Sequence, residues 1–226
     1  MRLLLIRHGQ TPDNVIGALG TTVPGVGLTE LGLRQAAALP AALADEGIGA
    51  LAVSTMLRTH LTAAPLAEAL GAEPLVLDGL REVEAGELEL RTDPEAAARY
   101  LGTVARWVVG DLDAHLDGAE DGHAFLARYD EAIARAAAGG HETVAVVSHG
   151  AAIRGWTGCR VEGAGGTFVR DHQLGNTGVV VLEGDVERGF RLVAWEGTPV
   201  GGPQLDDPTA DDPTGEAPAD EAAAAR

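Results

Sequence analysis

Two arginines and two histidines follow short apolar runs, at positions where they can form one anion-binding site. Arg7 and His8 come directly after the first run, and His149 follows another run late in the chain. Arg58 lies one helical turn after Ser54, which ends a third run. Arginine presents a planar, permanently charged fork to oxyanions, and histidine can donate a hydrogen bond or act as a nucleophile. These residue types indicate a pocket for phosphate or another tetrahedral oxyanion.

The apolar runs alternate with helical patterns along the chain. This alternation predicts an α/β fold, a three-layer sandwich whose mostly parallel central sheet has helices on both faces. Carboxyl ends of parallel strands meet at one edge of such a sheet, so the four side chains can converge there. The expected strands cover 3–6, 50–53, 74–77, 143–147, 177–182 and 191–195, with the last two joined at Gly184-Asp185, and the expected helices cover the stretch from Thr29 into the mid-40s, 56–70, 93–109, 121–138 and the residues after Gly150.

Composition limits the class of protein. The chain has 226 residues, 46% of them apolar, which predicts one compact domain over residues 1–200. No apolar run approaches the roughly 20 residues of a membrane span, and the start has no leader pattern. Cys159 is the single cysteine, which is typical of a reducing, cytoplasmic compartment. The net charge of −18 argues against nucleic acid or an anionic membrane as partner.

Residues 201–226 differ from the rest in composition. They are rich in Pro, Ala, Gly and acidic residues, and Leu205 is their only large aliphatic side chain. Such a segment buries too little apolar surface to offset its ordering entropy, so we expect a disordered, solubilising tail. Its acidic side chains are Asp206, Asp207, Asp211, Asp212, Glu216, Asp220 and Glu221.

Several short motifs, taken together in chain order, resemble the histidine phosphatase superfamily in its phosphoglycerate-mutase-like branch. One such motif would be weak, but five in family order across residues 3 to about 182 are highly specific. The five matching stretches are Arg7-His8-Gly9-Gln10-Thr11 with Asn14, Leu28 to Gly32 with Gln35-Ala36, Ser54 to Thr59 with Thr62-Ala63, Leu80-Arg81-Glu82-Val83, and Val147-Ser148-His149-Gly150. Asn176-Thr177 before the final strands also resembles the family's ending.

The resemblance implies a role for each matching residue. His8 corresponds to the nucleophile that takes the phosphoryl group as a phosphohistidine. Glu82 corresponds to the acid that protonates the leaving oxygen and then activates water. The charge on the phosphoryl oxygens would be held by Arg7, Arg58 and His149, and the pocket would be completed by Asn14 and by the backbone around Gly9 and Gly150. No metal or cofactor is implied, because the two arginines neutralise the charge.

Other acids and histidines are weighed against these roles. Glu84 and Glu87 are rivals of Glu82 for the acid, and the Arg-Glu pair after a strand favours Glu82. Glu120 and Asp121 stand where relatives often have Glu-Ser near the rim of the site, so Asp121 departs from that pattern. The remaining histidines lack the spacing of a metal site and are expected at the surface, in loops or in structural positions.

Three functions are compatible with these residues. The leading hypothesis is a phosphatase acting on a small phosphorylated metabolite through His8. A phosphoglycerate-type mutase shares the same core, but the acids Glu87 and Glu89 lie where a polyanionic substrate would bind and favour the phosphatase. An inactive phospho-ligand binding module is the third. The substrate is not identified by the 12–27 loop or the 84–122 insertion, and an exposed edge strand would allow a homodimer.

Overall fold

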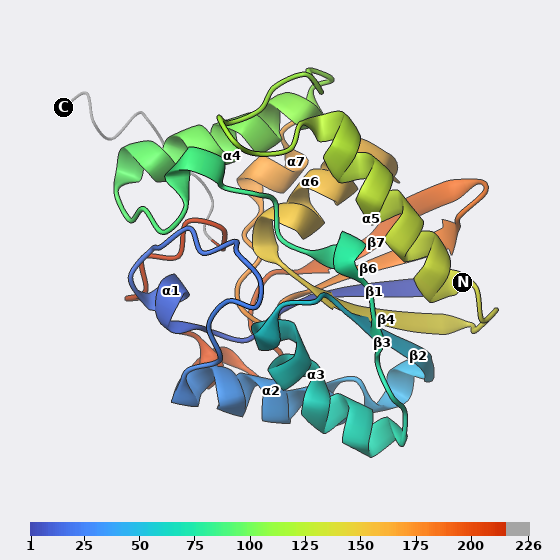
Figure 1. The fold of residues 1–226 in the computed structure, drawn as a ribbon. Helices are drawn as coiled ribbons and strands as arrows, with labels where there is room; N and C mark the ends of the chain where they lie inside the picture. The colour runs from blue at the N-terminus through green and yellow to red at the C-terminus, as the bar shows by residue number, and fades with distance from the viewer. Residues whose placement is uncertain (216–226) are drawn as a thin grey trace.

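A seven-stranded mixed sheet forms the centre of the computed structural model, which describes residues 1–215 (Figure 1). The strand order is β3-β2-β4-β1-β6-β7-β5. β1, β2, β3 and β4 run parallel, β6 pairs antiparallel with β1 and β7, and β5 runs parallel to β7. The strands are β1 Arg2–Arg7, β2 Ile48–Val53, β3 Leu75–Val76, β4 Thr143–Ser148, β5 Val161–Glu162, β6 Val179–Asp185 and β7 Gly189–Glu196.

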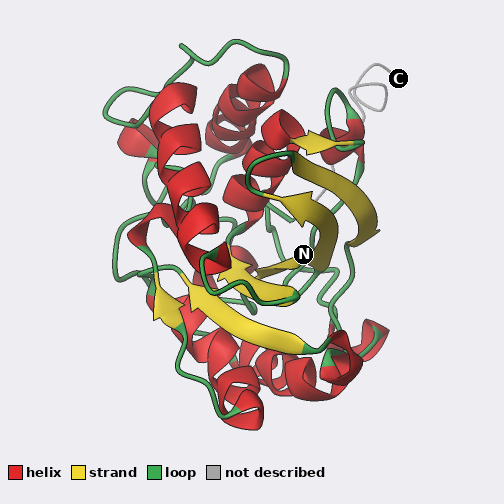
Figure 2. Ribbon diagram, turned by 90° about the vertical axis from the view of Figure 1, so that its right-hand side faces the viewer, coloured by secondary structure: helices red, strands yellow, loops and turns green. Residues whose placement is uncertain are grey.

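Helices cover both faces of the sheet, which confirms the predicted three-layer α/β fold. α2 and α3 lie on one face, and α4, α5, α6 and α7 lie on the other (Figures 1 and 2). The helices are α1 Pro12–Val15, α2 Glu30–Ala42, α3 Leu57–Leu70, α4 Pro94–Val108, α5 Gly122–Ala137, α6 Gly150–Arg160 and α7 Phe168–Asp171.

Each central strand is apolar on both sides because both of its faces are covered. Leu3 and Leu5 belong to the core under α4, α5 and α6, whereas Leu4 and Ile6 belong to the core against α2 and α3. Burying one such side chain stabilises the fold by about 1.5–3 kcal/mol. The two cores therefore fix the strand register, and Arg7 is the last residue of β1, paired with Ser148 at the end of β4.

Most predicted elements are present, with shifts at their ends. Thr29 caps α2 as expected, and its hydroxyl accepts the backbone N–H of Gly32. The hairpin between β6 and β7 turns over 186–188 rather than at Gly184-Asp185, because both strands are longer than predicted. Of the short elements, α1, β5 and α7 were not predicted.

Residues 201–215, which the composition predicts to be disordered, have a defined conformation in the structure. They form a 3-10 turn, Pro203–Leu205, and then pass the carboxyl end of β1, where Asp212 contacts Arg7. Gln35 Nε2 donates to the carbonyl of Leu205 at 2.8 Å, and the carbonyl of Gly215 accepts from Leu174 N at 3.0 Å. We call residues 205–215 the C-terminal strap. The rest of the expected tail, 216–226, lies outside the described residues.

None of the helices within residues 1–215 combines the length and the apolar character that a membrane crossing requires.

Candidate active site

The site lies at the carboxyl ends of β1, β2 and β4, where the parallel strands were predicted to deliver their side chains. β4 lies between β1 and β2, so the residues that follow all three strands are neighbours. The backbone N–H of His8 donates to the carbonyl of Ser148 at 3.0 Å, which links the Arg7-His8 motif to the Ser148-His149 motif. Five predicted side chains gather here, with exposed fractions of 0% for Arg7, 3% for His8, 4% for Arg58, 5% for Glu82 and 0% for His149.

His8 is held as a neutral ring with one free nitrogen lone pair. Its Nδ1 lies 2.8 Å from the carbonyl oxygen of Gly9. A carbonyl can only accept, so Nδ1 carries the proton and Nε2 keeps its lone pair. Burial, and then the charges of Arg58 and Arg7, hold the pKa of His8 well below its usual range. The ring is therefore uncharged near neutral pH, as a nucleophile must be.

His149 has the same burial but uses both ring nitrogens. Arg58 Nε donates to His149 Nδ1 at 3.1 Å, so Nε2 holds the proton and donates to Ser54 Oγ at 2.8 Å. Burial and the neighbouring Arg58 keep the pKa of His149 well below its usual range. A neutral His149 thus orients the Arg58 guanidinium, and its ring meets that of His8 edge-on at 5.2 Å between centroids.

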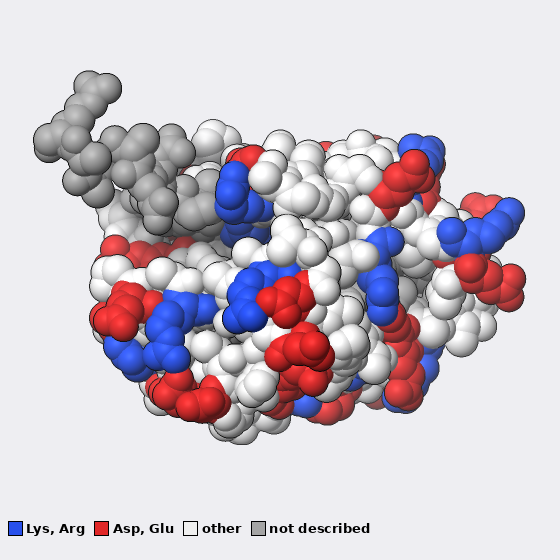
Figure 3. Space-filling view, turned by 90° about the horizontal axis from the view of Figure 1, so that it is seen from above, with Lys and Arg blue, Asp and Glu red and all other residues white. Residues whose placement is uncertain are grey.

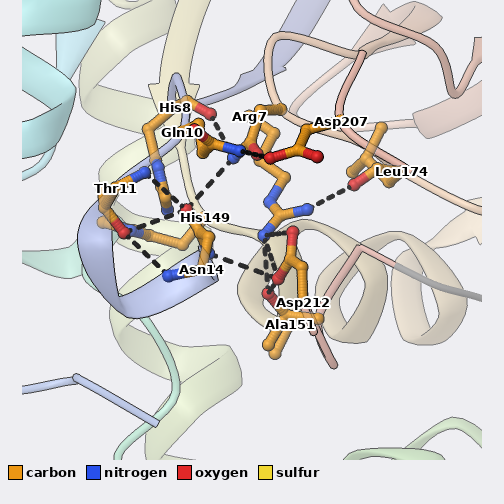
Figure 4. Close-up of polar contacts among 12 residues, drawn as sticks. Arg7, His8, Gln10, Thr11, Asn14, His149, Ala151, Leu174, Asp207 and Asp212 are labelled. Atoms are coloured by element: carbon orange, nitrogen blue, oxygen red, sulfur yellow. Dashed lines mark hydrogen bonds and ion pairs between the residues drawn. The ribbon is translucent and has the colours of Figure 1, made fainter. Parts of the chain in front are cut away.

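Arg7 projects from the end of β1 between the sheet and the C-terminal strap (Figure 4). Its Nη1 donates to the carbonyl of Leu174 at 2.9 Å. Its Nη2 lies 2.6 Å from the Asp212 carboxylate and donates to Thr214 Oγ1 at 2.8 Å. The Nε atom is buried and has no partner among the described residues. Arg7 therefore keeps one donor available for a further acceptor.

Glu82 is a buried carboxyl group at the amino end of α6. It accepts the backbone N–H groups of Ala152 at 2.7 Å, Val83 at 2.9 Å and Ala151 at 3.2 Å. Burial raises its pKa, and this effect outweighs the opposing N–H groups and Arg58. A raised pKa keeps part of the population protonated closer to neutrality, which suits a proton donor.

Two residues that sequence reasoning missed hold the backbone around Glu82. Tyr100 donates its hydroxyl to the carbonyl of Val83 at 2.8 Å. Arg128 donates to the Glu82 carbonyl at 3.0 Å and is itself paired with Glu120. Glu120 therefore acts through Arg128. Side chains that bind backbone carbonyls leave no spacing pattern, so no motif identifies Arg128 from sequence.

The predicted pocket residues Gly9, Asn14 and Gly150 also lie here. Asn14 Oδ1 accepts from the backbone N–H of Thr11 at 3.0 Å, and its Nδ2 reaches Asp212 at 3.2 Å. A Cβ on Gly9 would come within 2.7 Å of the carbonyl oxygen of Gly32, so only glycine fits there. Gly150 opens α6 directly after His149.

The rival acids lie away from this cluster. Glu84 pairs with Arg81 and accepts from the backbone N–H of Glu120, and Glu87 pairs with Arg99 at the surface. Asp121, which departs from the family pattern, caps α5 by accepting from Ala124 N at 2.8 Å. Within residues 1–215, no group of three or more His, Cys, Asp and Glu side chains is arranged to hold a metal ion.

A small cavity of about 30 Å³ lies in the middle of these groups, and we call it the His8 pocket. The lining includes His8, Arg58, Glu82, Tyr100, Asp13, residues 18–21 and the strap residues Asp212 to Thr214.

The fold and these motifs define the class of protein. The family model of the histidine phosphatase superfamily (branch 1) matches residues 3–198. The chain belongs to this superfamily, which confirms the resemblance seen in the sequence.

Known proteins of several kinds are similar to this chain. A PE-PGRS family protein of Mycobacterium tuberculosis is 38% identical over 216 residues, covering 88% of this chain and 37% of its own length. An adenosylcobalamin/alpha-ribazole phosphatase of Salmonella typhimurium is 30% identical over 135 residues, covering 60% and 66%. The solved mycobacterial glucosyl-3-phosphoglycerate phosphatase in complex with VO3 is 26% identical, has a TM-score of 0.72 and covers 87% of this chain and 99% of its own. The chain thus spans 37% of the PE-PGRS relative and 53% of a bifunctional M. tuberculosis relative.

Proposed function

We propose that this protein is a metal-independent phosphatase that hydrolyses a small phosphomonoester through a phosphohistidine on His8. The observation that carries the proposal is the buried, neutral His8 with an unprotonated Nε2, lining one pocket with Arg58 and Glu82. The family and the VO3 complex of a similar phosphatase support an oxyanion in that pocket.

In the first step, His8 Nε2 attacks phosphorus in line with the leaving oxygen. The N–P bond forms as the P–O bond breaks, and the Glu82 carboxyl proton passes to the leaving alcohol. Arg7 and Arg58 hold the non-bridging oxygens and stabilise their charge, which is the main source of catalysis in phosphoryl transfer. The Nδ1–H bond to Gly9 remains throughout and stabilises the charge that the ring acquires.

In the second step, Glu82 acts as a base. Its carboxylate takes a proton from water, the water oxygen attacks phosphorus, and the N–P bond breaks to release phosphate and neutral His8. The regained proton readies Glu82 for another turnover. One carboxyl group can serve both steps because its pKa is raised toward neutrality.

The basic residues that a mutase would use for a second anionic group are paired elsewhere. Arg91, Arg99 and Arg106 bind Asp93, Glu87 and Asp111, respectively. On the face seen in Figure 3, arginines lie beside acidic side chains and form no continuous basic patch. Glu89 accepts from the backbone and hydroxyl groups of Thr21 and Thr22 and so holds the loop over the pocket. These pairings favour hydrolysis over transfer to a carboxylated acceptor.

Compartment and assembly stay predictions from the sequence. The single Cys159 favours a cytoplasmic location, where thiols stay reduced. A homodimer through an edge strand is expected by analogy with other open sheets and is testable by light scattering.

Phosphate release from p-nitrophenyl phosphate and from a panel that includes phosphoserine, 3-phosphoglycerate and glucosyl-3-phosphoglycerate tests the proposal. We expect release by the native chain and none above background by His8→Ala. An alkaline quench followed by mass spectrometry should find the phosphoryl group on His8. Unchanged turnover by His8→Ala would refute the mechanism, and formation of 2-phosphoglycerate without phosphate release would indicate the mutase. Binding without turnover of any ester would indicate a binding module.

A further inference from the structure

Residues 212–214 of the C-terminal strap line the His8 pocket, and the strap is anchored before and after them. Gln10 Nε2 donates to Asp207 Oδ2 at 2.9 Å before the pocket, and Leu174 N donates to the carbonyl of Gly215 at 3.0 Å beyond it. Between these anchors, Asp212 is 7% exposed although it belongs to an otherwise polar, acidic segment. A carboxylate is buried in this way when it is paired.

Asp212 takes the donors that a bound phosphoryl group needs. Its Oδ2 lies 2.6 Å from Arg7 Nη2, and its Oδ1 accepts from Asn14 Nδ2 at 3.2 Å (Figure 4). Thr214 adds a hydroxyl oxygen at 2.8 Å from the same Arg7 Nη2. The strap thus offers Arg7 and Asn14 three oxygen atoms, as the three non-bridging oxygens of a phosphomonoester would.

The strap also occupies the space beside the amino end of α6. A Cβ on Gly150 would lie 2.9 Å from both the carbonyl and the hydroxyl oxygen of Thr214. The cavity that remains next to His8 has a volume of about 30 Å³. A bound phosphate group brings five heavy atoms, and its oxygens would need the positions on Arg7 that the Asp212 and Thr214 oxygens fill. A phosphoryl group can therefore bind Arg7 Nη2 only when Asp212 and Thr214 leave it.

Charge repulsion prevents the Asp212 carboxylate and a phosphate from binding Arg7 at the same time. A phosphate dianion and the Asp212 carboxylate would share one guanidinium in a buried site, where like charges repel strongly. A phosphoryl group can still compete with the strap for Arg7, because Arg7 Nε has no partner among the described residues while the strap is bound. A phosphoryl group can use that additional donor.

We propose that the C-terminal strap is an intramolecular competitive inhibitor, with the Asp212 carboxylate occupying the phosphate position on Arg7. This regulation rests on the proposed function, because the competing ligand is the substrate's phosphoryl group. The apparent affinity for any phosphomonoester is lowered by the fraction of molecules in which the strap is closed. Release of the strap therefore raises activity at low substrate without changing the chemistry at His8.

The test compares the full-length variants Asp212→Asn and Asp211→Asn. Both remove one charge from adjacent positions, but only Asp212 contacts Arg7, and Asp211 is exposed. We expect Asp212→Asn to lower the Kd of inorganic phosphate, measured by calorimetry, and the KM for p-nitrophenyl phosphate about tenfold, since a charge-assisted hydrogen bond is lost. The kcat should stay unchanged, and Asp211→Asn should match the native chain.

Thr214→Val gives a second, nearly isosteric probe that keeps Asp212. It removes the hydroxyl that contacts Arg7 and Asp212 Oδ1 and should lower the same Kd and KM about threefold, with thermal melting showing that the fold is intact. Weaker phosphate binding in both variants would overturn the proposal, because the strap would then be orienting Arg7 for the anion. No change in either variant, or an equal effect of Asp211→Asn, would overturn it as well.

Phosphate binding separates this proposal from the proposed function. Tighter phosphate binding by Asp212→Asn in a chain that hydrolyses no ester would support the strap and refute the phosphatase. Turnover that disappears in His8→Ala but does not respond to Asp212→Asn or Thr214→Val would support the phosphatase and refute the strap.

Discussion

The floor and the roof of the His8 pocket are held by different forces. We call the floor the buried cluster of His8, Arg58 and Glu82, which line the pocket, together with His149 and Ser54, which support Arg58 from behind. The roof is the C-terminal strap, and neither apolar core of the described chain contains any of its residues. Hydrogen bonds and one ion pair hold the strap in place.

This difference separates what must stay rigid from what can move. The floor side chains follow strands packed in the two apolar cores, and they hydrogen-bond to each other. Moving them apart would require the strands to separate, which would expose a large apolar surface. When the strap leaves the pocket, its hydrogen bonds to the protein are replaced by hydrogen bonds to water. Each such bond stabilises the bound strap by only about 0.5–1.5 kcal/mol net. Substitutions in the floor should therefore reduce kcat, whereas those in the roof should change KM.

The largest effect is expected for Glu82→Gln, which removes the proton donor but keeps the shape of the side chain. We expect kcat for a poor leaving group to fall about 1,000-fold. The alkaline limb of the pH–rate profile should also disappear, because the native enzyme loses its acid as pH rises through the raised pKa of Glu82. Glu84→Gln, at the rival acid, is the matched control and should retain native kcat. Equal losses in both variants would contradict this assignment.

A smaller loss is expected for Arg58→Lys. Lysine keeps the charge but loses the planar fork and the Nε–H that binds His149 Nδ1. We expect kcat to fall about 100-fold, the usual range for one group that stabilises the transition state. Arg99→Lys, in a surface ion pair with Glu87, should match the native enzyme. A native kcat in Arg58→Lys would show that positive charge alone suffices in the floor.

The two floor histidines also predict a pH dependence of stability. Both pKa values are lowered on folding, so between the folded pKa and about 6.5 the unfolded chain binds more protons. The free energy of unfolding should therefore decrease as pH falls from 7.5 to 5.5, as measured by urea denaturation. His149→Gln should flatten this dependence, and His123→Gln, at an exposed site, should leave it unchanged. Because the raised pKa of Glu82 contributes a slope of the opposite sign, the decisive curve is that of the Glu82→Gln chain, and a flat curve there would contradict the buried, neutral state.

The smallest effect is expected for an anchor of the roof. Asp207→Ala removes the carboxylate that accepts from Gln10. A looser strap should lower KM for p-nitrophenyl phosphate about threefold, in line with one ordinary hydrogen bond. Its neighbour Asp206 is exposed, so Asp206→Ala serves as control. A higher KM in Asp207→Ala would mean that the anchored strap helps substrate binding.

The same contrast explains how much could be predicted from sequence. The fold class and the position of the floor follow from apolar runs that end in Arg7-His8, Ser54 and Ser148-His149, because adjacent parallel strands place their ends together. The roof could not be predicted in this way. Asp212 of the strap pairs with Arg7, which lies 205 residues earlier in the chain. The prediction of disorder rested on the low apolar content of residues 201–226, and apolar content takes no account of an ion pair.

The strap belongs to the same polypeptide as the pocket it closes, and this has a practical consequence. A separate inhibitor dissociates when the mixture is diluted, but a tethered one keeps a constant effective concentration. The closed fraction should thus be identical in a crowded cell and in a nanomolar assay, and specific activity should not vary with enzyme concentration. A ligand for Arg7, or a partner that captures the strap, would change it.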